Sequence, residues 1–313
     1  MRRMMIGAVV TALVATVAVG PRADAAPSSV VFPVDSLHEP LTQRDIHGTL
    51  HEAPCAAGTV VLLQHGLSYT RRAWDRPGYS VVEPLLASGF DVVTVDRLGY
   101  GESTLPSGYD VSSEAHAYNT AQIVEALRGE YGYEHVVIGG HSAGSETSLL
   151  AAGLFGAGDA VLGLGYHHFP SDQIVTDVVT GDIPRALQDD YEYFLGTPEH
   201  RAGMFYTDAA DAVVVADDTA HAVLTPSGEI FSIGKQPSRY VVPAIDVPVF
   251  LQFGDSDRLF PAEFADEEQA LFTAPVDVDI VTDAGHSFML HPTGPAGSAR
   301  LAAWVADRFE GCG

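Results

Sequence analysis

One ten-residue stretch constrains the fold of this chain more than any other. Residues 135–144 read HVVIGGHSAG, a β-branched run that ends in glycines and delivers a serine to the start of a helix-like segment. Gly140, Ser142 and Gly144 match the G-x-S-x-G pattern of a tight strand-to-helix turn that exposes the serine hydroxyl. Side chains at the flanking positions would collide with neighbouring backbone, so glycine suits both. The stretch predicts a buried strand, a candidate nucleophile and then a helix.

The same alternation of strand and helix continues on both sides of this stretch. Apolar runs typical of strands buried on both faces cover residues 59–64, 91–95, 160–164 and 247–253, and residues 276–281 also predict a strand. Helix-like segments cover residues 81–87, 113–130, 262–272 and 298–309, and residues 45–51 alternate as an edge strand or hairpin does. The pattern predicts an α/β fold with a mostly parallel central sheet and helices on both faces.

The alternation stops between residues 166 and 242. Prolines and acidic residues interrupt the apolar pattern there. A segment of this length between two core strands is more often functional than structureless, and we interpret it as an inserted lid or cap. The predicted organisation is therefore a core in two parts, 26–165 and 243–313, around an insertion at 166–242.

The first 25 residues resemble a secretory signal peptide. Arg2 and Arg3 precede an apolar run, and Ala23–Asp24–Ala25 form an A-x-A cleavage site. The apolar run is shorter than the roughly 20 residues that span a bilayer, which disfavours a membrane anchor. We predict cleavage after Ala25 and a secreted protein with no stable membrane anchorage.

Two further features follow from composition. The net charge of −25, with Lys235 as the only lysine, disfavours nucleic acid and anionic membranes as partners, and such a charge also keeps a secreted protein soluble.

Cys55 and Cys312 are the only cysteines. In an exported chain an even number of cysteines predicts a disulfide, and the alternative is two unpaired thiols.

Five motifs in order along the chain resemble the α/β-hydrolase superfamily over roughly residues 49–309. They are His65–Gly66, Asp96-x-x-Gly99-x-Gly101-x-Ser103, the Ser142 turn, Gly254-x-x-Asp257 and Gly285–His286. Each follows a predicted strand, and the carboxyl ends of parallel strands are where an open sheet places its active site. The resemblance implies an α/β-hydrolase fold and a serine-based catalytic site.

The resemblance also implies a role for each candidate residue. Ser142 is the nucleophile and His286 the base that takes its proton. A carboxylate in the Gly254 loop orients the imidazole, and Asp257 fits the family pattern better than Asp255, which is left as a loop-capping residue.

The family pattern assigns the oxyanion hole to two backbone N–H groups, those of Leu67 and Ala143. His65, which precedes this loop, is expected to shape it and not to react. No H-E-x-x-H motif occurs, so we predict neither a metal nor a cofactor.

These features predict a secreted serine hydrolase that cleaves a carboxylic ester or lactone of a small apolar acyl substrate through an acyl-enzyme. The insertion is rich in aromatic and apolar residues, which favours an apolar substrate. An amidase or peptidase for small apolar substrates and a cofactor-free perhydrolase remain alternatives, because the same triad serves them. A non-catalytic binding protein on the same fold is the alternative from another class.

Overall fold

A computed structural model of the chain describes residues 26–39, 41–55, 58–172, 176, 192–194 and 198–311. The predicted signal peptide and Cys312 lie outside these ranges. None of the helices within them combines the length and the apolar character needed to cross a bilayer.

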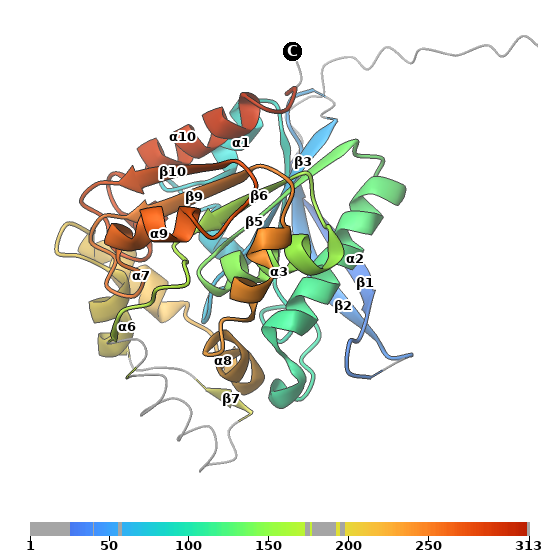
Figure 1. The fold of residues 1–313 in the computed structure, drawn as a ribbon, viewed down its shortest axis with the longest axis horizontal. Coiled ribbons are helices and arrows are strands. Elements are labelled where there is room, and N and C mark those ends of the chain that lie inside the picture. The colour runs from blue at the N-terminus through green and yellow to red at the C-terminus, as the bar shows by residue number, and fades with distance from the viewer. Residues whose placement is uncertain are drawn as a thin grey trace, which may run out of the picture.

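The described residues form a central eight-stranded sheet in the order β1-β2-β4-β3-β5-β6-β9-β10 (Figure 1). Its strands are β1 (Ser28–Asp35), β2 (Gln43–His51), β3 (Thr59–Gln64), β4 (Asp91–Val95), β5 (His135–His141), β6 (Ala160–Leu164), β9 (Val249–Gly254) and β10 (Val276–Val281). The six strands β4, β3, β5, β6, β9 and β10 pair in parallel in that order. At the other edge β1 and β2 form an antiparallel hairpin, and β2 pairs with β4 in antiparallel orientation. The predicted mostly parallel sheet is confirmed.

Helices cover both faces of this sheet. Successive side chains of each strand point to opposite faces, so each face carries apolar side chains that a helix layer buries. In β3, Val60 and Leu62 pack against α2 (Ser113–Gly129) and α3 (Ala143–Phe155), on the face that also carries α9 (Ala265–Gln269). Val61 and Leu63 pack on the other face, against α1 (Val82–Ala87) and α10 (Gly294–Ala306). Strands buried on both sides are apolar throughout, which is why their sequence showed no alternation.

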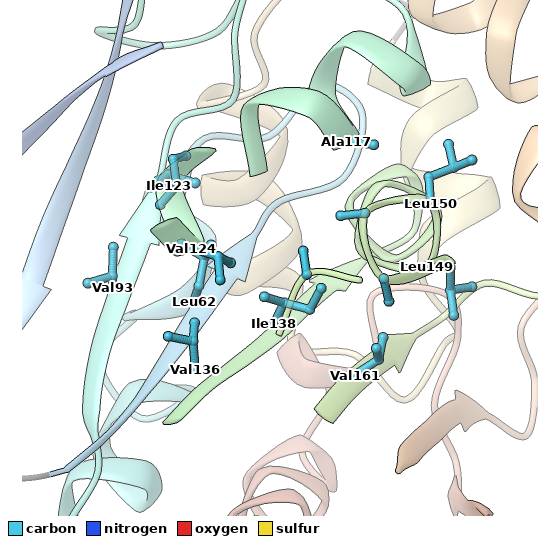
Figure 2. Packing of buried hydrophobic residues seen from close by; sticks show 14 of the residues in the cluster. Leu62, Val93, Ala117, Ile123, Val124, Val136, Ile138, Leu149, Leu150 and Val161 are labelled. Atoms are coloured by element: carbon cyan, nitrogen blue, oxygen red, sulfur yellow. The ribbon is translucent and has the colours of Figure 1, made fainter. Parts of the chain in front are cut away.

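The core fixes the helix that follows Ser142. Leu149 of α3 lies beside Val161 of β6 (Figure 2), and Leu149, Leu150, Ile138 and Val161 belong to one buried apolar cluster. Removing one such fully buried leucine side chain costs about 2–5 kcal/mol of folding free energy. The packed core therefore fixes the position of the turn at the start of α3.

The segment between β6 and β9 contains several helices in its described part. They are α6 (Pro198–Phe205), α7 (Ala212–Ala220) and α8 (Ser227–Ile233), together with the short antiparallel pair β7 (Tyr193–Phe194) and β8 (Thr225–Pro226). Short 3-10 turns, η4 (Pro237–Tyr240) and η5 (Val242–Ala244), lead back to the sheet. In Figure 1 α6 and α8 lie at one end of the sheet, below its strands. This segment is called the insertion below.

Two predicted helices differ from those observed. The expected helix at 262–272 is a 3-10 turn, η6 (Ala262–Phe264), followed by the short α9. The closing helix begins at Gly294 instead of residue 298. Its second residue is Pro295. Proline usually interrupts a helix, but it is tolerated in the first turn, where the backbone N–H groups have no intrahelical acceptor.

Candidate active site

The turn between β5 and α3 holds Ser142 in a strained conformation. Its backbone φ is 55°, in the left-handed region that side chains rarely adopt. A Cβ atom on Gly140 would lie 2.2 Å from the backbone of Gly144, and one on Gly144 would lie 2.2 Å from the carbonyl oxygen of Gln64. Both glycines are therefore required by neighbouring backbone, as the sequence pattern predicted. The turn leaves Ser142 8% exposed at the start of α3.

A buried carboxylate and imidazole face each other near this turn. His286 Nδ1 lies 2.9 Å from Asp257 Oδ2, and both side chains are almost completely buried. The other oxygen, Asp257 Oδ1, accepts hydrogen bonds from the backbone N–H groups of Leu259 at 2.8 Å and Phe260 at 3.1 Å. These donors fix the carboxylate, so that Oδ2 is directed at the imidazole. The arrangement favours the tautomer with the proton on Nδ1.

The rival aspartate, Asp255, lies in a different environment. Its carboxylate accepts hydrogen bonds from the N–H groups of Asp283 at 3.0 Å and Ala284 at 3.2 Å. It thus joins the loop after β9 to the loop that leads into His286. Of the two aspartates that the sequence offered, the structure brings Asp257 to the imidazole and gives Asp255 contacts typical of loop bracing.

The second nitrogen of the imidazole is the free base atom. His286 Nε2 is buried and has no hydrogen-bond partner among the described residues, so it is not hydrogen-bonded to Ser142 Oγ in this conformation. Such catalytic hydrogen bonds often form or tighten only when substrate binds. Rings of His141, Phe205 and Phe260 surround the imidazole, at centroid distances of 4.7, 5.1 and 5.7 Å. The base is therefore shielded from bulk water.

The two expected oxyanion donors lie at adjacent turns. Ala143 is the first residue of α3, where a helix leaves its N–H groups without acceptors. Leu67 follows β3, and a Cβ atom on the neighbouring Gly66 would lie 3.0 Å from Ser142 Cβ. Neither N–H donates to an acceptor in the described part of the chain. The Leu67 turn and the Ser142 turn are thus in direct contact.

His65 is fixed in the loop that it was expected to shape. Its Nδ1 lies 2.8 Å from the Gly66 carbonyl oxygen, and its Nε2 accepts the backbone N–H of Arg97 at 3.1 Å. Burial, together with the Arg97 charge, holds the pKa of His65 well below its usual value, so the ring is neutral. Both ring nitrogens are occupied by backbone, which leaves the ring no free atom for chemistry.

Sequence reasoning missed His141, which occupies a variable position of the G-x-S-x-G motif. Its Nε2 lies 2.9 Å from the carbonyl oxygen of His286. Burial and the neighbouring His286 hold its pKa well below the usual range, so the neutral ring donates this hydrogen bond. His141 thereby ties the base to the nucleophile turn. No signal in the sequence distinguishes it from any other buried residue.

The proposed disulfide stays a prediction. Cys55 lies after β2 and is half-buried, whereas Cys312 lies outside the described residues.

A family model and a curated protein match this chain. The model of the alpha/beta hydrolase family matches residues 60–296. A protein from Synechocystis sp. named as a non-heme chloroperoxidase is 26% identical over 228 residues, covering 66% of this chain and 77% of that protein.

Solved structures share the fold at lower sequence identity. A thermophilic esterase from Thermogutta terrifontis superposes with a TM-score of 0.72 at 17% identity, covering 89% of this chain and 98% of the esterase. A bromoperoxidase from Bacillus anthracis has a TM-score of 0.64 at 20% identity, covering 89% and 99%. An esterase from Exiguobacterium antarcticum has a TM-score of 0.68 at 18% identity, covering 88% and 100%.

Proposed function

Because the chain belongs to the alpha/beta hydrolase family, we propose that it is a serine hydrolase that cleaves a carboxylic ester or lactone through an acyl-enzyme. The observation that carries the proposal is the buried Asp257–His286 pair, in which His286 Nε2 has no hydrogen-bond partner within the described part of the chain. A histidine base that is oriented by a carboxylate can activate the hydroxyl of a serine in the same site.

The proposed reaction has two halves. Ser142 Oγ attacks the ester carbonyl while His286 Nε2 takes its proton, and the imidazolium is stabilised by Asp257. His286 then gives the proton to the leaving alcohol, which departs and leaves an acyl group on Ser142. In the second half, water attacks the acyl group with His286 again as base, and the carboxylic acid and free serine are released.

The oxyanion of each tetrahedral intermediate would be stabilised by the N–H groups of Leu67 and Ala143. Both groups are backbone donors held by folded structure, so they need no reorganisation as the charge develops. Losing one donor of this kind raises the barrier by roughly 3–4 kcal/mol. They supply this stabilisation without a metal or a cofactor.

An uncharged, apolar acyl substrate is part of the proposal. The aromatic rings of Phe205 and Phe260 beside the base support it, as does the net charge of −25, which repels anionic substrates. Esterases are among the structural neighbours. We also place the mature protein outside the cell, with the leader 1–25 removed and Cys55 joined to Cys312. The insertion would act as the lid over the substrate.

Perhydrolysis is the second candidate, since one relative is named as a chloroperoxidase and one structural neighbour as a bromoperoxidase. Hydrogen peroxide would replace water as the attacking group on the acyl-enzyme, which would release a peracid and free Ser142. The same residues serve both reactions, so the two candidates differ only in the second nucleophile. Amide hydrolysis differs from both in its leaving group.

One set of assays separates the candidates. The mature protein and its Ser142→Ala variant are given chromogenic esters from acetyl to palmitoyl, the matching anilides, and acetate with hydrogen peroxide. We expect ester cleavage that peaks at one chain length and is lost in the variant. Anilide cleavage at comparable rates would indicate an amidase, and peracid formation faster than ester hydrolysis a perhydrolase. Equal inertness of two folded proteins on every substrate would refute a general esterase and leave a hydrolase of narrow specificity or the non-catalytic binding protein.

A further inference from the structure

The turn that carries the proposed oxyanion donor Leu67 is strained at the next residue. Ser68 has a φ of 58°, in the left-handed region. Its hydroxyl donates to the Leu67 carbonyl oxygen at 2.6 Å, which is a local contact within the turn. A non-glycine residue keeps such a conformation only where surrounding groups hold it. The direction of the Leu67 N–H therefore depends on what holds Ser68.

The insertion holds Ser68 at two points. The backbone N–H of Val223, which follows α7, donates to the Ser68 carbonyl oxygen at 3.0 Å. Arg201 of α6 donates through Nη1 to the Ser68 hydroxyl oxygen. Both contacts come from residues more than a hundred positions along the chain from the turn. The turn of the core is thus fixed from outside the core.

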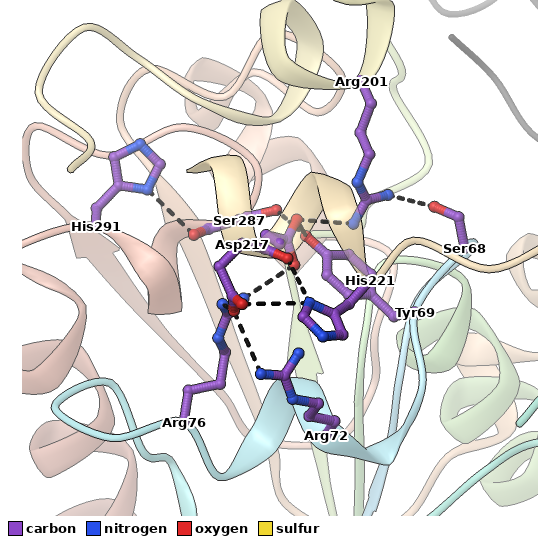
Figure 3. Close-up of polar contacts among 10 residues, drawn as sticks. Ser68, Tyr69, Arg72, Arg76, Arg201, Asp217, His221, Ser287 and His291 are labelled. Atoms are coloured by element: carbon purple, nitrogen blue, oxygen red, sulfur yellow. Dashed lines mark hydrogen bonds and ion pairs between the residues drawn. The ribbon is translucent and has the colours of Figure 1, made fainter. Parts of the chain in front are cut away.

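Several contacts fix Arg201, and Figure 3 shows the polar ones. Its Nη2 lies 2.9 Å from Asp218 Oδ2, and both side chains are 5% exposed. Its guanidinium lies over the ring of Tyr69, 4.2 Å from the centroid, and over that of Phe205 at 4.6 Å. A planar guanidinium can make two directed hydrogen bonds and stack at the same time, which an ammonium group cannot do.

Asp218 makes this charge tolerable in the interior. It accepts hydrogen bonds from Tyr69 Oη at 3.2 Å and from Arg76 Nη1 at 3.2 Å, in addition to Arg201. Burial is the main cause that raises the pKa of Tyr69 to about 12, so the phenol keeps its proton and donates. Tyr69 Oη also lies 2.7 Å from the hydroxyl oxygen of Ser287, the residue after His286. The cluster in Figure 3 therefore contacts both the turn that carries Leu67 and the loop that carries His286, through Ser68 and Ser287.

The same face of α6 contacts the catalytic histidine. Phe205 lies one helical turn after Arg201, at the i, i+4 position that shares its face. The Phe205 carbonyl oxygen accepts the backbone N–H of Ser287 at 3.0 Å, and its ring lies 5.1 Å from that of His286. Arg201 on one turn thus faces the oxyanion side of the site, and Phe205 on the next turn faces the base.

We propose that Arg201 is a positioning residue for the oxyanion turn, so that the insertion completes the catalytic site of the core. This inference rests on the proposed serine hydrolase function. Arg201 acts through Ser68 and not by touching substrate, so its loss is expected to lower kcat with little change in KM.

Steady-state kinetics of Arg201 and Ser68 variants, single and combined, test the inference on the best ester substrate. We expect Arg201→Ala to lower kcat by about 10–100-fold, less than the roughly 100–1000-fold loss for removing one oxyanion donor, because the donor is displaced and not removed, with KM changed less than threefold. Arg201→Lys keeps the charge beside Asp218 but lacks the planar guanidinium that reaches Ser68 and Asp218 together. It should therefore fold normally and show most of the kcat loss of Arg201→Ala. Added guanidinium should restore part of the activity of Arg201→Ala. Ser68→Ala combined with Arg201→Ala should be no worse than the more impaired single variant.

Arg72→Ala is the matched control. Arg72 also joins the core to α7, through Asp217 at 3.4 Å, but both side chains are more than a third exposed. We expect its kcat to stay within twofold of the parent. Equal losses of kcat in Arg72→Ala and Arg201→Ala, full activity in Arg201→Lys, or additive effects in the double variant would overturn the inference.

Hydrogen exchange separates this inference from the proposed function. In Arg201→Ala, but not in Arg72→Ala, the amides of residues 66–69 should exchange faster while those of β3 remain unchanged. A protein without esterase activity that shows this change would refute the proposed function and keep the positioning contact. Unchanged exchange in this turn would refute the positioning contact whatever the activity.

Discussion

Asp257→Asn tests the assigned catalytic acid through a tautomer. The Asp257 Oδ1 atom accepts two backbone N–H groups, from Leu259 and Phe260. In the variant the amide oxygen must occupy this position, because an NH₂ group there would face two donors. The NH₂ group is then directed at His286 Nδ1, which must become an acceptor. The imidazole proton moves to Nε2, the atom that should receive the proton of Ser142.

The expected loss is large and confined to catalysis. A histidine held in the wrong tautomer lowers kcat by about 10⁴-fold, which corresponds to about 5.5 kcal/mol of activation free energy. The two backbone hydrogen bonds and the side-chain volume are kept, so thermal unfolding should change little. The assay is ester hydrolysis at saturating substrate, with thermal unfolding followed on the same preparations.

Asp255→Asn is the control, because Asp255 contacts backbone and not the imidazole. It should lose less than tenfold in kcat. A folded Asp257→Asn variant that keeps more than a tenth of the parent kcat would refute the reasoning. So would a larger loss in Asp255→Asn than in Asp257→Asn.

Three further predictions concern stability. Gly144→Ala places a Cβ atom 2.2 Å from the Gln64 carbonyl oxygen, so we expect at least 3 kcal/mol of destabilisation or no folded protein, as chemical denaturation would show. Burial raises the pKa of Glu146 to about 8, above its unfolded value, so this residue lowers stability progressively as pH rises from about 4.5 to 8, by up to about 1.4 kcal/mol per pH unit. Glu146→Gln should unfold with a correspondingly flatter pH dependence over that window, and parallel curves would contradict the assignment. Cys55→Ser should raise the free-thiol count per chain in denaturant from none to one, at Cys312, and lower the unfolding temperature, whereas two free thiols in the parent protein would exclude the disulfide.

Strong local patterns made most of the core predictable from the sequence. The segments that became β3, β4, β6 and β10 were placed at their observed bounds, because short β-branched or apolar segments between turn residues have few other solutions. Ser142 was located for a similar reason. The glycines on either side of it answer to a steric requirement that only glycine meets, so the motif carries its own structural cause.

Contacts between distant segments were not predictable in the same way. Choosing Asp257 over Asp255 rested on a family pattern, because both aspartates stand in one loop and only the three-dimensional structure shows which one faces His286. Arg201 gave no signal at all. It lies on a short helix of weak apolar periodicity, and its partners Ser68 and Asp218 are joined to it only by folding.

The most direct test of the account is covalent capture of the nucleophile. The protein is incubated with a fluorophosphonate and, separately, with p-nitrophenyl acetate quenched in acid, and the adducts are mapped by peptide mass spectrometry. The account predicts one adduct per chain on Ser142, none in Ser142→Ala, and much slower labelling in His286→Ala. An ester-cleaving protein labelled at another residue, or a Ser142→Ala variant that keeps the parent activity, would contradict it.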